Sequence, residues 1–204
     1  MLVQDILKKV HRKFAKDTDY PEEGSEDLLV RIDHLNDGIA EWENKVKEGV
    51  YWTELVSDTP MTLGGTGSDT LPSDFLSLIR KNNEDDDASS ILIGSTVWTE
   101  ASPAEGLQAA AAGLSPHIFW QEGKTLKTLP AATGSVPYLR KATRYATGSE
   151  TTEPEMSDTS FLEDYTLSKV FLDNADDTLY AVYAQSAKEK LDGMEYEALS
   201  VRSE

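Results

Sequence analysis

The 204-residue sequence contains no cysteine. Such a chain forms no disulfide bond and offers no thiolate to a metal ion or a nucleophilic site. It also has no uninterrupted apolar run long enough to span a bilayer, so no membrane partner is expected. The basic residues near its start are not followed by the apolar stretch of a secretory signal, which favours an intracellular protein.

Positive charge is scarce. The 19 lysines and arginines are outnumbered by 37 aspartates and glutamates, which leaves a net charge of −18 at pH 7. DNA affinity arises largely from counterions released as Lys and Arg neutralise phosphates, so this balance argues against a sequence-reading DNA-binding protein. The charge is uneven, since residues 1–16 carry +4 and residues 149–204 carry −10. Solubility is the plain alternative reason for an acidic surface.

Hydrophobic spacing predicts helices in the first quarter of the chain. Apolar residues recur every three or four positions over residues 3–14 and again over residues 28–46. Each set places one apolar stripe on one helix face. Ser25 is the expected N-cap of the second helix, and Gly49 is its expected end.

A second helical region is expected after residue 148. The pattern Ser160-x-x-Glu163 is typical of a capping box that opens a helix. Apolar residues continue from there at helical spacing, and Gly193 is the expected end of the last helix. These helices are expected to complete the bundle that the first two begin.

The middle of the chain loses the helical period and gains Gly, Thr, Ser and Pro. Short apolar runs bounded by these residues predict a small antiparallel β layer. The runs are Ile91–Ile93, Val97–Trp98, Ile118–Trp120, Thr125–Leu129 and Tyr138–Tyr145. The Leu71–Phe75 reversal is expected to lead into a short helix that ends at Ile79. The Ala109–Ala112 run fits a helical turn and a flexible loop equally well.

The expected fold class is therefore α+β, an antiparallel helical bundle with an inserted small antiparallel β layer. Its expected parts are the N-terminal helices of the bundle (1–52), a β-rich insertion with a short helix (53–148), the C-terminal helices of the same bundle (149–193) and a C-terminal arm (194–204).

Patterns that signal catalysis or metal binding are missing from the sequence. The three histidines, His11, His34 and His117, lack the spacing that presents two imidazoles to one metal. No serine lies in a G-x-S-x-G motif, and Gly64–Ser68 lacks the lysine of a phosphate-binding loop. Residues 83–94 imitate a calcium loop without its glycine and its final glutamate. No enzyme activity, metal or cofactor is expected, although the many carboxylates leave a paired-carboxylate glycosidase open.

Several segments resemble one known family in their order along the chain. The segments are Asn36–Trp42, Leu71–Phe75, Pro116–Pro130, Tyr138–Thr143, the acidic link Glu153–Glu155, and the late positions Tyr180, Tyr183 and Ala184. Together they resemble the head-to-tail connector (adaptor) proteins of tailed double-stranded DNA bacteriophages. The resemblance covers roughly residues 25 to 194 and rests on loose motifs. Residues 102–114 depart from it by being longer and richer in alanine.

The resemblance implies a structural protein of the virion neck that is made in the host cytoplasm. It implies a bundle with a β insertion, assembled as a ring of twelve copies between the portal protein and a tail or nozzle protein. The ring would line a channel through which DNA passes without tight binding. An unrelated acidic scaffold protein and a cell-wall-degrading glycosidase of the virion are the alternative interpretations.

Two sets of candidate site residues follow. Glu84, Asp85, Asp86 and Asp87 are the candidates for the acidic lining of the DNA channel, with an ordinary solvated turn as the alternative. The C-terminal arm is expected to dock on the portal, because a short tail with several large apolar side chains is poorly explained as a solvated end. Its docking candidates are Met194, Tyr196, Leu199 and Val201. The alternative is that Tyr196 and Leu199 fold back on their own bundle.

Overall fold

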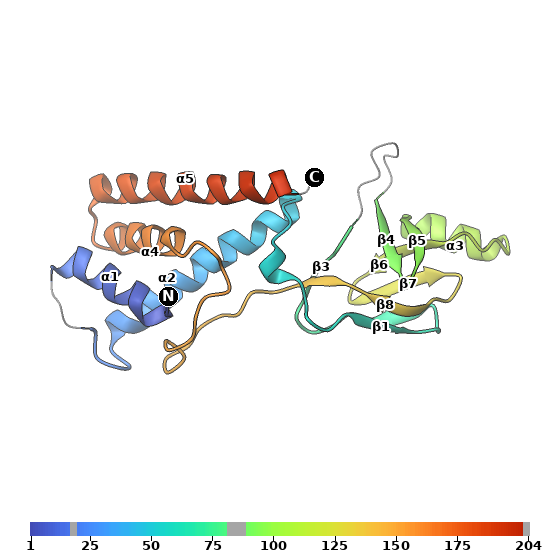
Figure 1. The fold of residues 1–204 in the computed structure, drawn as a ribbon, viewed down its shortest axis with the longest axis horizontal. Helices are drawn as coiled ribbons and strands as arrows, with labels where there is room; N and C mark the ends of the chain where they lie inside the picture. The colour runs from blue at the N-terminus through green and yellow to red at the C-terminus, as the bar shows by residue number, and fades with distance from the viewer. Residues whose placement is uncertain (17–19, 81–88, 202–204) are drawn as a thin grey trace. The chain divides into compact units, whose positions relative to one another are not determined.

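The computed structural model describes residues 1–16, 20–80 and 89–201. The chain divides into two units. The helical unit comprises Met1–Glu54 together with Ala142–Glu204, and the β unit comprises Leu55–Lys141. The chain thus leaves the helical unit after Glu54 and returns to it at Ala142 (Figure 1). The fold class is α+β, as the sequence predicts.

The helical unit is built from four α-helices and short 3-10 turns. In chain order they are α1 (Val3–Ala15), α2 (Glu26–Asn44), η1 (Lys45–Glu48), η2 (Thr53–Leu55, whose last residue belongs to the β unit), α4 (Ser160–Asp173) and α5 (Asp177–Val201). Helix α4 packs against α1, α2 and α5. Because it meets neighbours on several sides, α4 buries polar as well as apolar residues, including Glu163 and Asp164.

The predicted apolar stripes of the first two helices are the bundle core. Their buried members are Val3, Ile6, Leu7 and Val10 in α1, and Leu28, Ile32, Leu35, Ile39 and Trp42 in α2. Ser25 is the N-cap of α2, and its hydroxyl accepts a hydrogen bond from the Leu28 N–H at 3.3 Å. Gly49 ends the following turn with a φ of +97°, a conformation that favours glycine. The predicted start is confirmed, whereas α2 itself ends at Asn44, and Gly49 ends the 3-10 turn that follows it.

The predicted capping box at the start of α4 is wrong. Thr159 is the N-cap residue, and Ser160 already lies inside the helix. The carboxylate of Glu163 forms ion pairs with Lys9 at 3.3 Å and Lys13 at 2.5 Å, both on α1. The Glu163 carboxylate, which would close a capping box, therefore pairs with lysines of another helix instead.

The predicted helix end at Gly193 is also wrong. Helix α5 continues through this residue to Val201. Leu191 and Met194 are buried on either side of it, at 5% and 8% exposure. Packing of these neighbours outweighs the roughly 1 kcal/mol by which glycine weakens a helix. Residues 194–201 are thus helix rather than the extended arm that the sequence predicts.

The β unit contains nine strands and one helix in its described residues. They are β1 (Met61–Gly64), β2 (Ser68–Thr70), β3 (Phe75–Leu78), β4 (Ser90–Ile93), β5 (Thr96–Glu100), α3 (Pro103–Ala111), β6 (Ile118–Glu122), β7 (Thr125–Leu129), β8 (Thr133–Val136) and β9 (Tyr138–Arg140). Five form a sheet in the order β2-β7-β6-β5-β4, and β1-β8 and β3-β9 form two-stranded sheets. The pairs are antiparallel except β5 with β6, which α3 connects.

The core of the β unit explains why one predicted helix is a strand. The segment expected to be helical up to Ile79 contains β3, which pairs with β9. Leu78 is buried in the core, and the Phe75 ring stacks on Tyr138 with centroids 5.8 Å apart. These contacts come from residues sixty positions later in the chain and override the local helical spacing.

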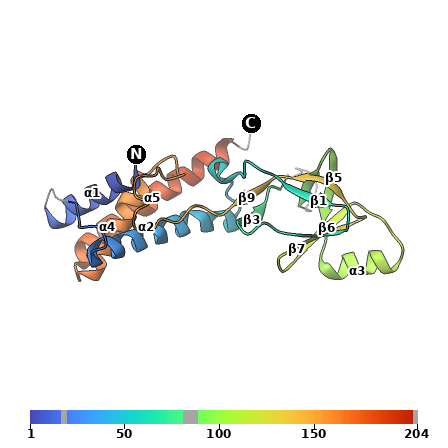
Figure 2. The same cartoon turned by 90° about the horizontal axis from the view of Figure 1, so that it is seen from below.

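Helix α3 settles the open interpretation of the alanine-rich segment, which is helical. The Ser102 hydroxyl accepts from the Glu105 N–H at 3.2 Å, and the Glu105 carboxylate accepts from the Ser102 N–H at 2.7 Å. This capping box fixes the start of the helix. Gly106 faces Trp120 of β6, and α3 lies along that strand (Figures 1 and 2).

Candidate functional site

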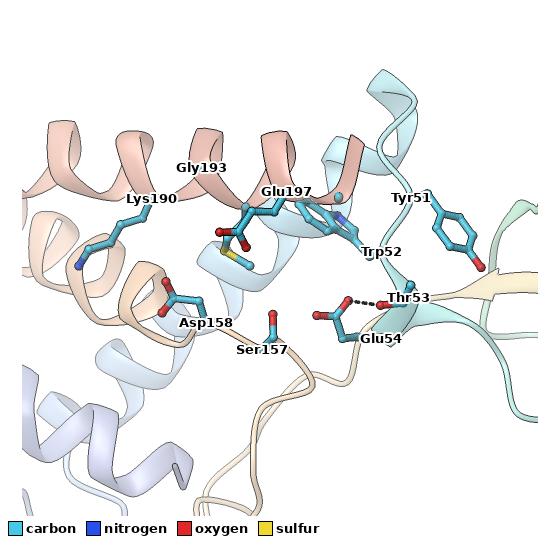
Figure 3. Close-up of a pocket in the computed structure, with 11 residues that line it drawn as sticks. Tyr51, Trp52, Thr53, Glu54, Ser157, Asp158, Lys190, Gly193 and Glu197 are labelled. Carbon is cyan, nitrogen blue, oxygen red and sulfur yellow. Dashed lines mark hydrogen bonds between the residues drawn. The ribbon is translucent and has the colours of Figure 1, made fainter. Parts of the chain in front are cut away.

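The helical unit carries a groove of about 510 Å³ beside the last turns of α5. Its walls are α5, the Tyr51–Glu54 segment and the two residues Ser157 and Asp158 that precede α4 (Figure 3). Every lining residue belongs to the helical unit. The groove is therefore defined by the packing of the bundle itself.

The floor of the groove is apolar and held in place. Trp52 is only 3% exposed, and its indole Nε1 donates a hydrogen bond to the Trp42 carbonyl at 3.0 Å. The two indole rings lie 5.5 Å apart. Met194 contributes a second buried apolar side chain from α5. The bonded, ring-packed indole gives the floor a fixed shape, and the flexible methionine can adapt to what is bound.

The rim of the groove is acidic. Glu54, Asp158 and Glu197 supply three carboxylates, and Lys190 supplies one ammonium group. Figure 3 shows Glu54, Ser157 and Asp158 along the side opposite α5, which carries Lys190 and Glu197. Among the described residues that line the groove, carboxylates thus outnumber cations.

The charge of Lys190 is directed into the bundle. Its Nζ lies 2.5 Å from the Asp164 carboxylate and donates to the Ser160 carbonyl at 3.2 Å. Asp164 also accepts from the Ser186 hydroxyl at 2.6 Å. Asp164 is only 5% exposed, whereas the Lys190 side chain is 32% exposed, so the pair is buried on its carboxylate side. The charge of Lys190 is therefore balanced by a carboxylate outside the groove.

The same cluster extends to α1. Glu163 is paired with Lys9 and Lys13, and Lys13 lies 3.9 Å from Asp164. Burial by itself lowers the pKa of Lys13, but the hydrogen bond and charge of Glu163 raise it above its ordinary value. The cluster ties α1, α4 and α5 together beneath the groove wall.

Gly193 lines the groove without a side chain, so the α5 backbone is open to the groove at this position. It lies mid-helix, and a Cβ at this position would meet no atom within 4 Å. Glycine is among the poorest helix formers, and no described neighbour lies close enough to require its small size here.

The predicted portal-docking residues divide between the groove and the surface. Met194 is buried in the groove floor, whereas Tyr196 is 75% exposed and Leu199 is 46% exposed. Val201 is the last helical residue of α5. Neither exposed side chain folds back on the bundle.

The predicted channel residues, Glu84, Asp85, Asp86 and Asp87, lie outside the described residues. The apparent calcium loop falls partly in the same stretch.

The groove has no signature in the sequence. No sequence motif singles out Trp52, Glu54 or Asp158. No local signal marks them, because these residues come from segments about a hundred positions apart. Only the clustering of carboxylates in the acidic flanks hints at such a rim.

The histidines serve separate contacts. His11 bonds to Arg31, His34 lies 2.7 Å from the Asp173 carboxylate, and His117 meets the Trp98 ring edge-on. Within residues 1–16, 20–80 and 89–201, no three metal-ligating side chains are grouped to hold an ion.

In the described part of the chain, no helix combines the length and the apolarity needed to cross a bilayer.

The chain matches no protein-family model and no curated protein sequence.

Proposed function

We propose that this protein is a structural head-to-tail connector of a tailed double-stranded DNA phage. In this proposal twelve copies form a ring in the virion neck, between the portal protein and a tail or nozzle protein. The ring completes the head and lines the channel through which DNA leaves. The proposal assigns the chain no catalytic role.

The observation that carries the proposal is the organisation of the chain. One helical unit is assembled from both ends of the chain, and a β unit occupies the residues between them. This is the organisation that the resemblance to phage connectors implies. Because fold alone does not fix function, the proposal also rests on the order of the motifs that carry the resemblance.

The charge of the chain supports the channel role. A net charge of −18 on every copy would make the ring strongly negative. Phosphates are repelled by such a surface, so DNA would pass without adhering. Tight, salt-sensitive DNA binding by the assembled ring would contradict this part of the proposal.

The end of α5 is the proposed portal contact. Tyr196 and Leu199 are exposed on a helix, so they are preordered and lose less freedom on binding than an extended arm would. The contact is thus made by helix turns, in place of the arm expected from sequence.

Electron microscopy of the purified chain mixed with its portal tests the ring directly. We expect one ring of twelve copies on the portal, and any other copy number would refute the assignment. The double variant Tyr196→Ser and Leu199→Ser should stay folded and lose portal binding. Val182→Ser, at an exposed position nearer the start of the same helix, is the matched control and should bind normally.

A further inference from the structure

We propose that the groove beside α5 binds a basic peptide segment of a partner protein, one that carries lysine or arginine and a large apolar side chain. The inference goes beyond the connector function, because that function assigns no ligand to the groove. It stands on the groove itself and holds whichever partner supplies the segment.

The size of the groove suits part of a polypeptide. A volume of about 510 Å³ lies within the roughly 300–1,000 Å³ typical of ligand clefts. The groove therefore has room for a few side chains of one segment. It lies along the last turns of α5, so an extended or helical segment can run beside that helix.

Charge selects the class of segment. Glu54 and Asp158 place two carboxylates at the rim, and the charge of Lys190, which also lines the groove, is balanced by Asp164. Such a rim repels acidic peptides and nucleic acids and attracts ammonium and guanidinium groups. A cationic partner is also the complement of a chain whose net charge is −18.

The apolar floor selects the anchor. Trp52 and Met194 line the groove, and polar residues surround them. An apolar centre within a polar rim is the arrangement in which a single large side chain contributes most to binding. We therefore expect leucine or a larger side chain beside the basic residues of the partner.

Gly193 supports an occupied groove. The helix would accept alanine here without a clash, yet the residue present is one that weakens a helix. Without a side chain at this position, a bound segment can approach the α5 backbone closely. A larger residue would fill that space and leave the fold intact.

The test uses the full-length protein and a fluorescein-labelled peptide of alternating lysine and leucine, followed by fluorescence anisotropy. Two comparison peptides replace lysine by glutamate or leucine by serine. We expect binding of the first peptide, no binding of the glutamate peptide, and at least about tenfold weaker binding of the serine peptide. Equal affinity for the serine and leucine peptides would reduce the effect to diffuse charge attraction and overturn the proposal.

Two pairs of variants locate the site. Gly193→Leu should weaken binding about tenfold or more, whereas Gly193→Ala should stay within about twofold of wild type. The double variant Glu54→Gln and Asp158→Asn should weaken binding about fivefold, and Glu22→Gln with Glu23→Gln, an equal charge change in an exposed turn, should not. Equal losses in the two charge variants would refute the groove as the site.

A second copy of the chain is the competing occupant, and sedimentation of the same proteins decides between the two. If Gly193→Leu abolishes self-association of the wild-type chain and leaves peptide affinity unchanged, the groove binds a copy of this protein and the proposal fails. Thermal unfolding of each variant shows that the fold is kept. Should Gly193→Leu not fold, Ala198→Leu fills the groove from the next turn. Because portal binding is not measured, failure here leaves the connector function untouched.

Discussion

Removing the Asp164 carboxylate should destabilise the helical unit strongly. Asp164 is 5% exposed and holds Lys190 at 2.5 Å and the Ser186 hydroxyl at 2.6 Å. Asp164→Ala leaves both donors without this acceptor inside the bundle. Removing one member of a fully buried ion pair costs about 3–5 kcal/mol.

The expected loss lies at the lower end of that range. The side chain of Lys190 is 32% exposed and that of Lys13 is 42% exposed, so both ammonium groups can regain water when the carboxylate is gone. Ser186 loses a charge-assisted hydrogen bond of about 1.5–3 kcal/mol. Together these give an expected decrease of about 3 kcal/mol in the free energy of unfolding. Asp164→Asn keeps an acceptor oxygen and should fall between alanine and wild type.

The same helix offers a matched control. Asp173 is the last residue of α4, and its carboxylate also lies close to a side chain of another helix, with His34 Nε2 at 2.7 Å. The Asp173 side chain, however, is 50% exposed. Asp173→Ala should therefore cost at most about 1 kcal/mol. Urea unfolding followed by far-ultraviolet circular dichroism reports chiefly on the helices and compares the two variants directly. If Asp164→Ala costs no more than Asp173→Ala, the buried cluster does not stabilise the bundle and this reasoning is wrong.

Two further predictions concern the β unit and the alkaline limit of stability. In Gly106→Ala the new Cβ would lie 2.7 Å from the Trp120 ring. We therefore expect the free energy of unfolding, measured in urea, to fall by about 1–3 kcal/mol, and the tryptophan fluorescence spectrum to change. An unchanged urea midpoint would show that α3 shifts freely to accommodate the methyl group. Burial, then the charge of Glu150, raises the pKa of Tyr20 to about 12, and burial, then the charge of Glu155, does the same for Tyr145. Because these folded-state pKa values exceed the ordinary value of 10.0, the stability that the two tyrosines contribute is full below pH 10.0 and is lost as pH rises toward 12. Ultraviolet titration should show tyrosines that ionise late in the folded protein only. Tyr145→Phe should remove one of these late-ionising groups.

Amphipathic helices were the part of the fold that the sequence predicted best. Their apolar spacing is local, and the residues in the stripe of α2 are the ones that the bundle buries. Ser25 and Gly49 act within one helical turn of themselves, so their roles were also readable. Four of the five predicted β runs contain the strand expected, and the fifth, Tyr138–Tyr145, is strand only as far as Arg140.

The incorrect secondary-structure predictions fall where contacts with residues far along the chain determine the local conformation. β1 and β8 pair with each other across some seventy positions, and each has only four residues, so their sequences carry little strand signal. β3 is a strand because of β9, and Gly193 stays helical because its neighbours are packed. In each case tertiary contacts outweigh a local preference of about 1 kcal/mol.

The groove was unpredictable for a related reason. Its lining joins the segment that follows α2, the residues before α4 and the last turns of α5. A single sequence shows many carboxylates but not which of them meet around Trp52. Only the fold turns an acidic composition into an acidic rim.

Several of the chain's few cations pair with carboxylates inside the bundle, and this affects the charge of the groove. The first sixteen residues are the most basic part of the chain, and Lys9 and Lys13 from this part pair with Glu163 inside the bundle. Lys190 is likewise drawn to Asp164. The cations near the buried carboxylates thus stabilise the packing of α1, α4 and α5, and the charge of Lys190 is directed to Asp164 and away from the groove rim. If Asp164 were replaced by alanine in a protein that still folds, Lys190 would turn toward the rim, and the basic peptide should bind more weakly even though no groove residue had changed.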